Sequence, residues 1–141
     1  MSALLDDALT SKLVSWVAVN RPDVIPPTLP IHVANRDELR TRPCMVLAAS
    51  DTKPVSGMRQ TARIKLDVHL FSQVDDTAAE DHAEWAAELA ALLSNVEPIQ
   101  ADLNTDIFCI HDLIARETAT TPDEQRGRET VLSYEAVVSA A

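Results

Sequence analysis

TARIKLDVHLF, residues 61–71, is the stretch of this sequence that decides the fold. Apolar and polar residues alternate along it, which is typical of a strand with one face in the core and one face in water. After a short acidic link the spacing becomes helical, with Trp85, Leu89 and Leu92 on one face. Residues 61–95 therefore predict one strand that leads into one helix. The apolar strand positions are Ala62, Ile64, Leu66, Val68 and Leu70, and the polar ones are Arg63, Lys65, Asp67 and His69.

The predicted helix carries a dense acidic cluster in its first turns. Thr77 and Glu80 have the spacing of a capping box, which places the start of the helix at Thr77. Paired carboxylates could act as an acid and a base, but acidic residues are also favoured at a helix start by the helix dipole. We interpret the cluster as a solvated face, with an acidic patch for a basic partner as the alternative. Its members are Asp75, Asp76, Glu80, Asp81 and Glu84.

The remaining elements follow from periodicity and from turn residues. Apolar residues at helical spacing predict a helix over residues 2–19, and the apolar run 44–49 is typical of a strand buried on both faces. Residues 50–60 are expected to form a loop, so that this strand and the alternating one make a hairpin. The later segments predict a connector at 98–105, a largely buried strand at 106–116, a polar hairpin loop at 117–128 and a last strand at 129–139.

A proline-rich segment separates the first helix from the first long strand. Pro22, Pro26, Pro27 and Pro30 favour a stiff, extended path over residues 21–42, with a possible short strand at 31–33. A connection of this length in a compact domain is usually functional. We expect an arm or linker that binds a partner.

These elements occur in the order α-β-β-α-β-β and predict an α+β fold. We expect a small mixed or antiparallel sheet of about four to five strands, with two main helices packed on one face. The 141 residues, 46% of them hydrophobic, are enough for one core and favour a single domain over residues 1–141.

The charge balance limits the classes of partner. The net charge is −10, from 22 acidic and 12 basic residues. Sequence-specific nucleic-acid binding and attachment to an anionic membrane both need a clustered basic surface, so we expect neither. Because there is no apolar run long enough to cross a bilayer and no signal-peptide pattern, synthesis in the cytoplasm is the default expectation.

No catalytic motif is present, and we expect a protein that is not an enzyme and has no cofactor. The sequence contains no P-loop, dinucleotide-binding glycine motif or nucleophile elbow. Cys109 and His111 could begin a zinc site, with Cys44, His69 or His32 completing it. Their spacing matches no common zinc motif, so we favour structural cysteines and histidines and expect no metal. The alternative function is a small cytoplasmic ligand-binding domain or enzyme of unknown substrate.

Basic residues in the predicted loops are the candidates for an interface. Such loops on an acidic protein are complementary to neighbouring copies of the same protein, and a head-to-tail contact of this kind can close into a ring. The basic candidates are Arg36 and Arg40 before the first long strand, Lys53 and Arg59 in the first loop, and Arg126 and Arg128 in the last. Met58, an apolar residue of the first loop, is a further candidate.

Four segments in order carry a resemblance to a known family. They are RPCMVL (42–47), TARIKLDVHLF (61–71), LAALL (89–93) and RETVLSYEAVV (128–138). With the N-terminal helix and the proline-rich linker, this order resembles the tail-terminator and tail-completion (neck) proteins of long-tailed bacteriophages. The family has no catalytic residues to transfer.

The resemblance implies a structural virion protein of the tail or neck. Such a protein forms a ring, commonly a hexamer, which caps the tail tube and joins the tail to the head connector while DNA passes through its channel. The implied partners are other copies of the chain, the tail tube protein and the head–tail connector protein. A negative channel would repel phosphate and let DNA slide, in agreement with the net charge of −10.

Overall fold

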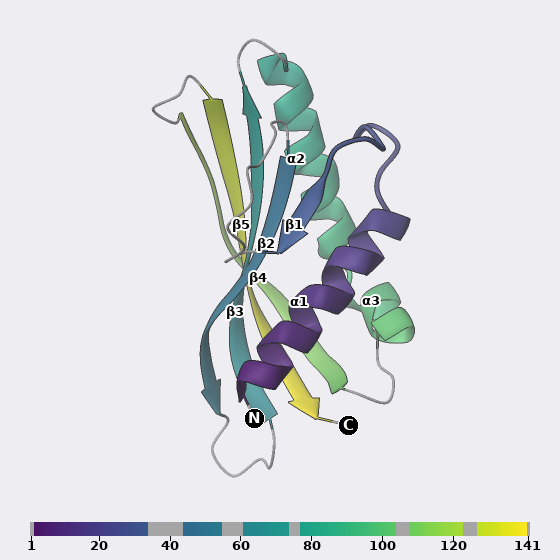
Figure 1. Ribbon diagram of the computed structural model, residues 1–141, viewed down its shortest axis with the longest axis vertical. Helices are drawn as coiled ribbons and strands as arrows, with labels where there is room; N and C mark the ends of the chain where they lie inside the picture. Colours follow the sequence, from purple (N-terminus) through teal and green to yellow (C-terminus); the bar gives the residue numbers. More distant parts are fainter. Residues whose placement is uncertain are drawn as a thin grey trace.

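The computed structural model describes residues 2–33, 44–54, 61–73, 77–103, 108–122 and 127–140 (Figure 1). Within these ranges the chain forms three helices and five strands. In chain order they are α1 (Ser2–Val19), β1 (Ile31–Val33), β2 (Cys44–Pro54), β3 (Thr61–Gln73), α2 (Ala79–Leu93), α3 (Val96–Leu103), β4 (Phe108–Pro122) and β5 (Gly127–Ala140).

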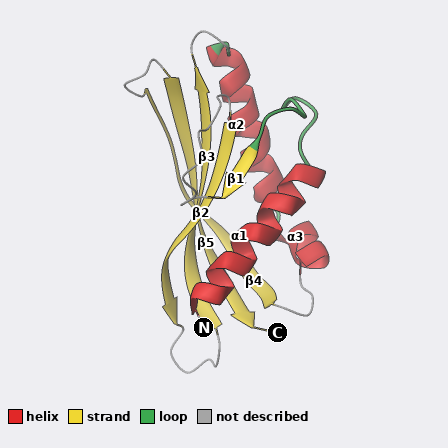
Figure 2. Cartoon of the chain, in the orientation of Figure 1, coloured by secondary structure: helices red, strands yellow, loops and turns green. Residues whose placement is uncertain are grey.

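The strands form one mixed sheet in the order β1-β2-β3-β5-β4. β1 runs parallel to β2, and the other neighbours are antiparallel. The helices lie on one side of the twisted sheet, and no described helix covers the other side (Figure 2). The α+β fold with helices on one face is therefore confirmed.

β3 is the central strand of the sheet, and it confirms the strand that the alternating stretch predicts. It pairs with β2 on one side and with β5 on the other. Its even positions from Ala62 to Leu70 are buried, whereas Arg63 and Lys65 are exposed. The even positions belong to the one hydrophobic cluster that also includes the buried faces of α1 and α2. The alternation of apolar and polar residues thus reflects the two faces of the sheet, one in the core and one toward solvent.

The start of β2 is buried on both faces, which confirms the prediction from its apolar run. Met45 and Leu47 face the helices and belong to the main core. Cys44 and Val46 lie on the opposite face, in register with Phe71 and His69, and are also buried.

The predicted capping box at Thr77 is wrong. α2 begins at Ala79, and its N-cap residue is Ala78, which has no side-chain hydrogen bond to offer. Thr77 is buried, and its backbone N–H donates to the carbonyl of Gln73 at the end of β3. Packing between strand and helix therefore overrides the local capping preference.

A third helix, α3, replaces most of the expected connector. Pro98 lies in its first turn, where the missing N–H removes no helical hydrogen bond. Ile99 and Leu103 are buried, and Gln100 Nε2 donates to the carbonyl oxygens of Ile110 and His111 in β4 at 2.9 and 3.2 Å. The helix thus packs on the sheet and binds the backbone of an edge strand.

β4 is longer than expected and extends to Pro122, into the predicted loop of residues 117–128. Residues 117–122 pair with β5 from Ser133 to Arg128. As the outermost strand on its side of the sheet, β4 exposes both faces along 115–120, so its polar composition resembles that of a loop.

The first half of the proline-rich segment packs against the core. Ile25 and Leu29 are buried, and the Arg21 guanidinium donates to the carbonyl oxygens of Pro26 and Leu29. The expected strand at 31–33 is confirmed as β1. Residues 34–42 of the expected arm lie outside the described residues.

Candidate functional site

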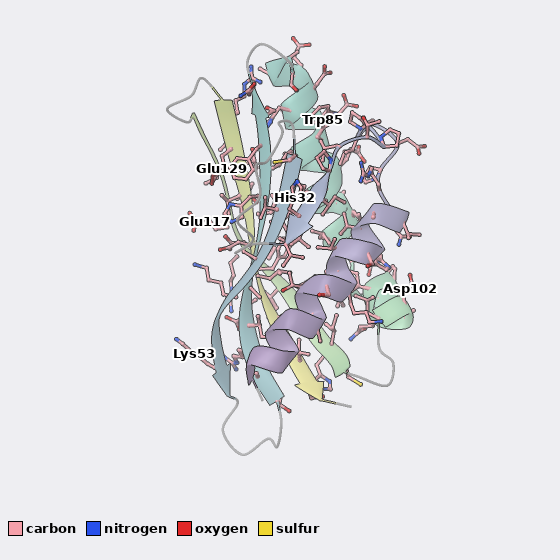
Figure 3. The ribbon with its side chains drawn as sticks, in the orientation of Figure 1. His32, Lys53, Trp85, Asp102, Glu117 and Glu129 are labelled. Atoms are coloured by element: carbon pink, nitrogen blue, oxygen red, sulfur yellow. The ribbon has the colours of Figure 1, made fainter. Side chains whose placement is uncertain are left out.

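The open face of the sheet is the best candidate for a functional surface. Figure 3 shows Lys53, Glu117 and Glu129 projecting away from the helices, whereas Trp85 and Asp102 lie on the helix side. The open face is built from the odd positions of β3 and β5, which alternation turns away from the core.

A basic groove of about 310 Å³ lies on this face. Four cations from three strands line it: Lys53 of β2, Arg63 and Lys65 of β3, and Arg116 of β4. All four side chains are exposed. Ser133, Tyr134 and Glu135 of β5 complete the lining. The groove therefore concentrates positive charge on a chain whose net charge is −10.

Strand register and irregular pairing assemble the groove. Lys53 lies opposite Arg63, and Lys65 lies opposite Glu135. The pairing of β2 is interrupted just before Lys53, and that of β4 shifts at Arg116, between Ala115 and Glu117. Such a bulge inserts an extra residue and redirects its side chain.

One carboxylate is shared by two of the four cations. Glu135 Oε2 lies 3.1 Å from Arg116 Nη2, and Oε1 lies 3.9 Å from Arg63 Nη1. Among the described side chains, neither Lys53 nor Lys65 has an ion-pair partner. The groove therefore keeps an excess of positive charge that an external carboxylate or phosphate could meet.

The solvent side of α2 has the opposite charge. Glu80, Asp81, Glu84 and Glu88 are exposed, and the helix contains neither lysine nor arginine. These residues agree with the interpretation of the acidic cluster as a solvated face. Asp75 and Asp76 of the same cluster lie outside the described residues.

A network of hydrogen bonds between polar side chains connects α2 to the sheet. Ser72 Oγ lies 2.6 Å from His82 Nδ1, and His82 Nε2 lies 2.7 Å from Thr130 Oγ1. A further contact of 2.8 Å joins Thr130 to Thr120. Ser72, His82 and Thr130 are all buried, so the serine hydroxyl is closed to a substrate in this arrangement. This network thus attaches α2 to β3 and β5.

The surroundings of His82 disfavour the charged form of its imidazole. Burial lowers the pKa of its imidazole, and the positive charge of Arg128 lowers that pKa further. Arg128 itself donates from Nη1 to the carbonyl oxygen of Thr77 at 2.8 Å. The sequence does not predict this network, although His82 lies at helical spacing from Trp85 and Leu89 and so shares their buried face.

The predicted interface residues fall into three groups. Lys53 lies in the basic groove. Arg128 lies at the beginning of β5, where it contacts Thr77. The others lie outside the described residues: Arg36, Arg40, Met58, Arg59 and Arg126. Sequence reasoning missed Arg63, Lys65 and Arg116 as site residues, although alternation already placed the first two on the polar face.

The residues considered for zinc are not brought together. His32, Cys44 and His69 lie at the end of the open face where β3 pairs with the beginning of β5. Cys109 and His111 lie near Ser139 at the other end, and His111 Nε2 is 2.8 Å from Ser139 Oγ. Among the described residues, no three histidine, cysteine or acidic side chains are grouped so that they could hold a metal ion.

The described helices do not include one with the length and hydropathy of a membrane span. No protein-family model and no curated protein matches the sequence. Solved structures do match the fold. A chain from the virion of a native gene transfer agent particle aligns with a TM-score of 0.67 over 94% of this chain and 96% of that chain, at 14% sequence identity.

A second solved structure, of a protein without a descriptive name, aligns with a TM-score of 0.55. The alignment covers 99% of this chain and 96% of that chain, at 16% identity. At these identities the comparisons establish a shared fold that extends over nearly the whole chain.

Proposed function

We propose that this chain is a structural protein of a phage-like virion. The observation that carries the proposal is the fold similarity to a chain of a gene transfer agent virion, which covers nearly the full length of both proteins. The proposed location is the virion, and the proposed role is assembly with other virion proteins.

The finer proposal is a role at the end of the tail. Copies of the chain form a ring, in the simplest case a hexamer, which caps the tail tube and joins it to the head connector while DNA passes through the centre. The order of elements supports this role through its resemblance to tail-terminator and neck proteins. The net charge of −10 also supports it, because an acidic ring does not grip the phosphates of passing DNA.

The described surface favours an assembly protein over an enzyme. Its serine–histidine pair is buried within the fold, and four of its basic side chains line an open groove on the sheet. The outer edge of β4 is available to a neighbour along 115–120, where both faces of the strand are exposed. These features are suited to contacts with macromolecules.

Tube capping can be tested with purified tail tube protein. We expect this chain to bind one end of each tube and to stop elongation, which negative-stain images and tube-length distributions would show. An acidic globular protein of similar mass at equal concentration is the control. Unchanged tube lengths together with bare tube ends would contradict the tail-end role.

A further inference from the structure

We infer that the basic groove is the docking site for the acidic side of α2 from a second copy of this chain. The groove is lined by Lys53, Arg63, Lys65 and Arg116, and the acidic side consists of Glu80, Asp81, Glu84 and Glu88. This inference rests on the self-association contained in the proposed function and names the surfaces that make the contact.

Charge complementarity is the first argument. Two copies that each carry a net charge of −10 repel one another at long range. A close contact is favoured only in orientations where opposite potentials meet. The groove holds four of the 12 basic residues of the chain but only one carboxylate, that of Glu135. It is therefore the described surface that an acidic copy would approach most favourably.

The shape and charge of α2 are the second argument. Glu80, Glu84 and Glu88 recur every four residues, so they form one row along the helix. Ala83 and Ala87, which are also exposed, lie beside this row. Their short side chains let another surface approach the helix closely. Because α2 has no lysine or arginine and His82 is buried, no cation of the helix itself neutralises the carboxylates on its solvent side.

The positions of the two surfaces make the contact repeatable. The groove lies on the open face of the sheet, whereas α2 belongs to the helix layer on the other face (Figure 1). One copy can therefore use its groove and its helix at the same time, with two different neighbours. A head-to-tail contact of this kind forms a ring when the rotation between copies closes, and an open filament when it does not.

Nucleic acid is the less suitable occupant of the groove. Glu135 lies inside the groove, and the exposed carboxylates of Asp112 and Glu117 lie along the neighbouring strand β4. A continuous phosphate backbone would meet these negative charges, whereas a single helix with spaced carboxylates can avoid them. Binding of duplex DNA is therefore an outcome to be tested against the contact between copies.

The decisive experiment exchanges the charges of the two surfaces. The groove variant is Lys53→Glu with Lys65→Glu, and the helix variant is Glu84→Lys with Glu88→Lys. Each alone should weaken self-association about tenfold or more, because reversal turns attraction into repulsion. Mixed in equal amounts, the two variants should assemble again, since each reversed groove then meets a reversed helix and each native groove a native helix.

Mass photometry measures assembly in solution, and negative-stain images measure ring occupancy at tube ends. Lys12→Glu on α1 is the matched control for Lys65→Glu made alone, because it changes the net charge equally and lies outside the groove. Lys65→Gln is a milder variant that avoids a second carboxylate opposite Glu135. Thermal melts verify that every variant is folded.

Recovery of assembly in the mixture supports the inference. Folded single variants that assemble like the wild type would overturn it, as would a mixture that stays dissociated. A third result would also overturn the inference: the wild type binds a short DNA duplex, and the groove variant loses this binding but assembles like the wild type. The groove would then be a phosphate site. If the wild type assembles neither in solution nor on tubes, the proposed function fails, which is distinct from failure of the groove contact alone.

Discussion

Glu135 Oε2 lies 3.1 Å from Arg116 Nη2, across the pairing of β5 with β4 and at the point where the β4 register shifts. The same carboxylate approaches Arg63 of β3. Three strands thus direct their charged side chains toward one position on the open face. Glu135 limits the positive potential of the groove without cancelling it.

Replacing Glu135 with glutamine should make the groove more positive. We expect E135Q to bind an acidic partner, such as a second copy of the chain, a few-fold more tightly at low salt. The gain should shrink as salt is added, because the groove is exposed and screening acts on it. Mass photometry across a salt series measures this effect. Glu97→Gln on α3 is the control with the same charge change, and an equal gain there would show that net charge alone is responsible.

The same substitution should change folding stability only slightly. Arg63 and Arg116 are both exposed, and ion pairs of this kind contribute about 0–1 kcal/mol. Urea unfolding of E135Q and the wild type measures the difference. A loss well above this range would indicate that Glu135 organises the β4 bulge itself.

His82 should make the fold sensitive to mild acid. Its pKa in the folded chain is below the ordinary value of 6.5, first because of burial and second because of Arg128. Below pH 6.5 the unfolded chain therefore binds more protons at this site than the folded chain does, so stability decreases as the pH falls. The contribution of His82 to folding stability is fully present above pH 6.5. It decreases as the pH falls, until the pH is below the pKa of His82 in the folded chain.

The comparison variant is His82→Gln, whose amide can still bond Ser72 and Thr130 but does not titrate in this range. We expect the wild type to lose more stability than H82Q between about pH 7 and pH 5. Denaturant midpoints at each pH measure the two slopes. Parallel slopes would mean that the carboxylates common to both proteins account for the acid sensitivity.

Arg128 should influence His82 through its charge. In Arg128→Gln the pKa of His82 should rise but remain below 6.5, because burial, the larger cause, is retained. Nuclear magnetic resonance titration of the imidazole measures this pKa. Stability should also decrease, since the bond from Arg128 to the Thr77 carbonyl is lost. An altered assembly with an unchanged His82 pKa would instead favour the role of Arg128 at an interface.

The contact between α1 and α3 should be measurable as a coupling energy. Trp16 Nε1 donates to Asp102 Oδ2 at 2.8 Å and joins two helices that are far apart in the sequence. In a cycle of Trp16→Phe, Asp102→Ala and the double variant, we expect a coupling of about 1–2 kcal/mol. Urea unfolding supplies the four free energies. Additive effects would show that the indole is held by packing alone.

The sequence by itself determined the elements that alternate or repeat clearly. Periodicity located β3 and β5, the apolar run located β2, and the first helix was correct to the residue. These predictions succeeded because burial of one face imposes a pattern on each element separately. Where the pattern is weak, local rules fail: the capping box predicted at Thr77 does not form, and the connecting segments predicted at 98–105 and 117–128 contain most of α3 and the last part of β4.

Only the tertiary structure decided which side chains meet. Lys53 was a candidate from its charge, but its place beside Arg63, Lys65 and Arg116 depends on the register of β2, β3, β5 and β4 and on two irregularities in their pairing. His82 likewise meets Ser72 and Thr130 only because α2 packs over β3 and β5. The physical reason is that periodicity reports the side of an element that is buried, whereas pairing between distant segments selects its neighbours.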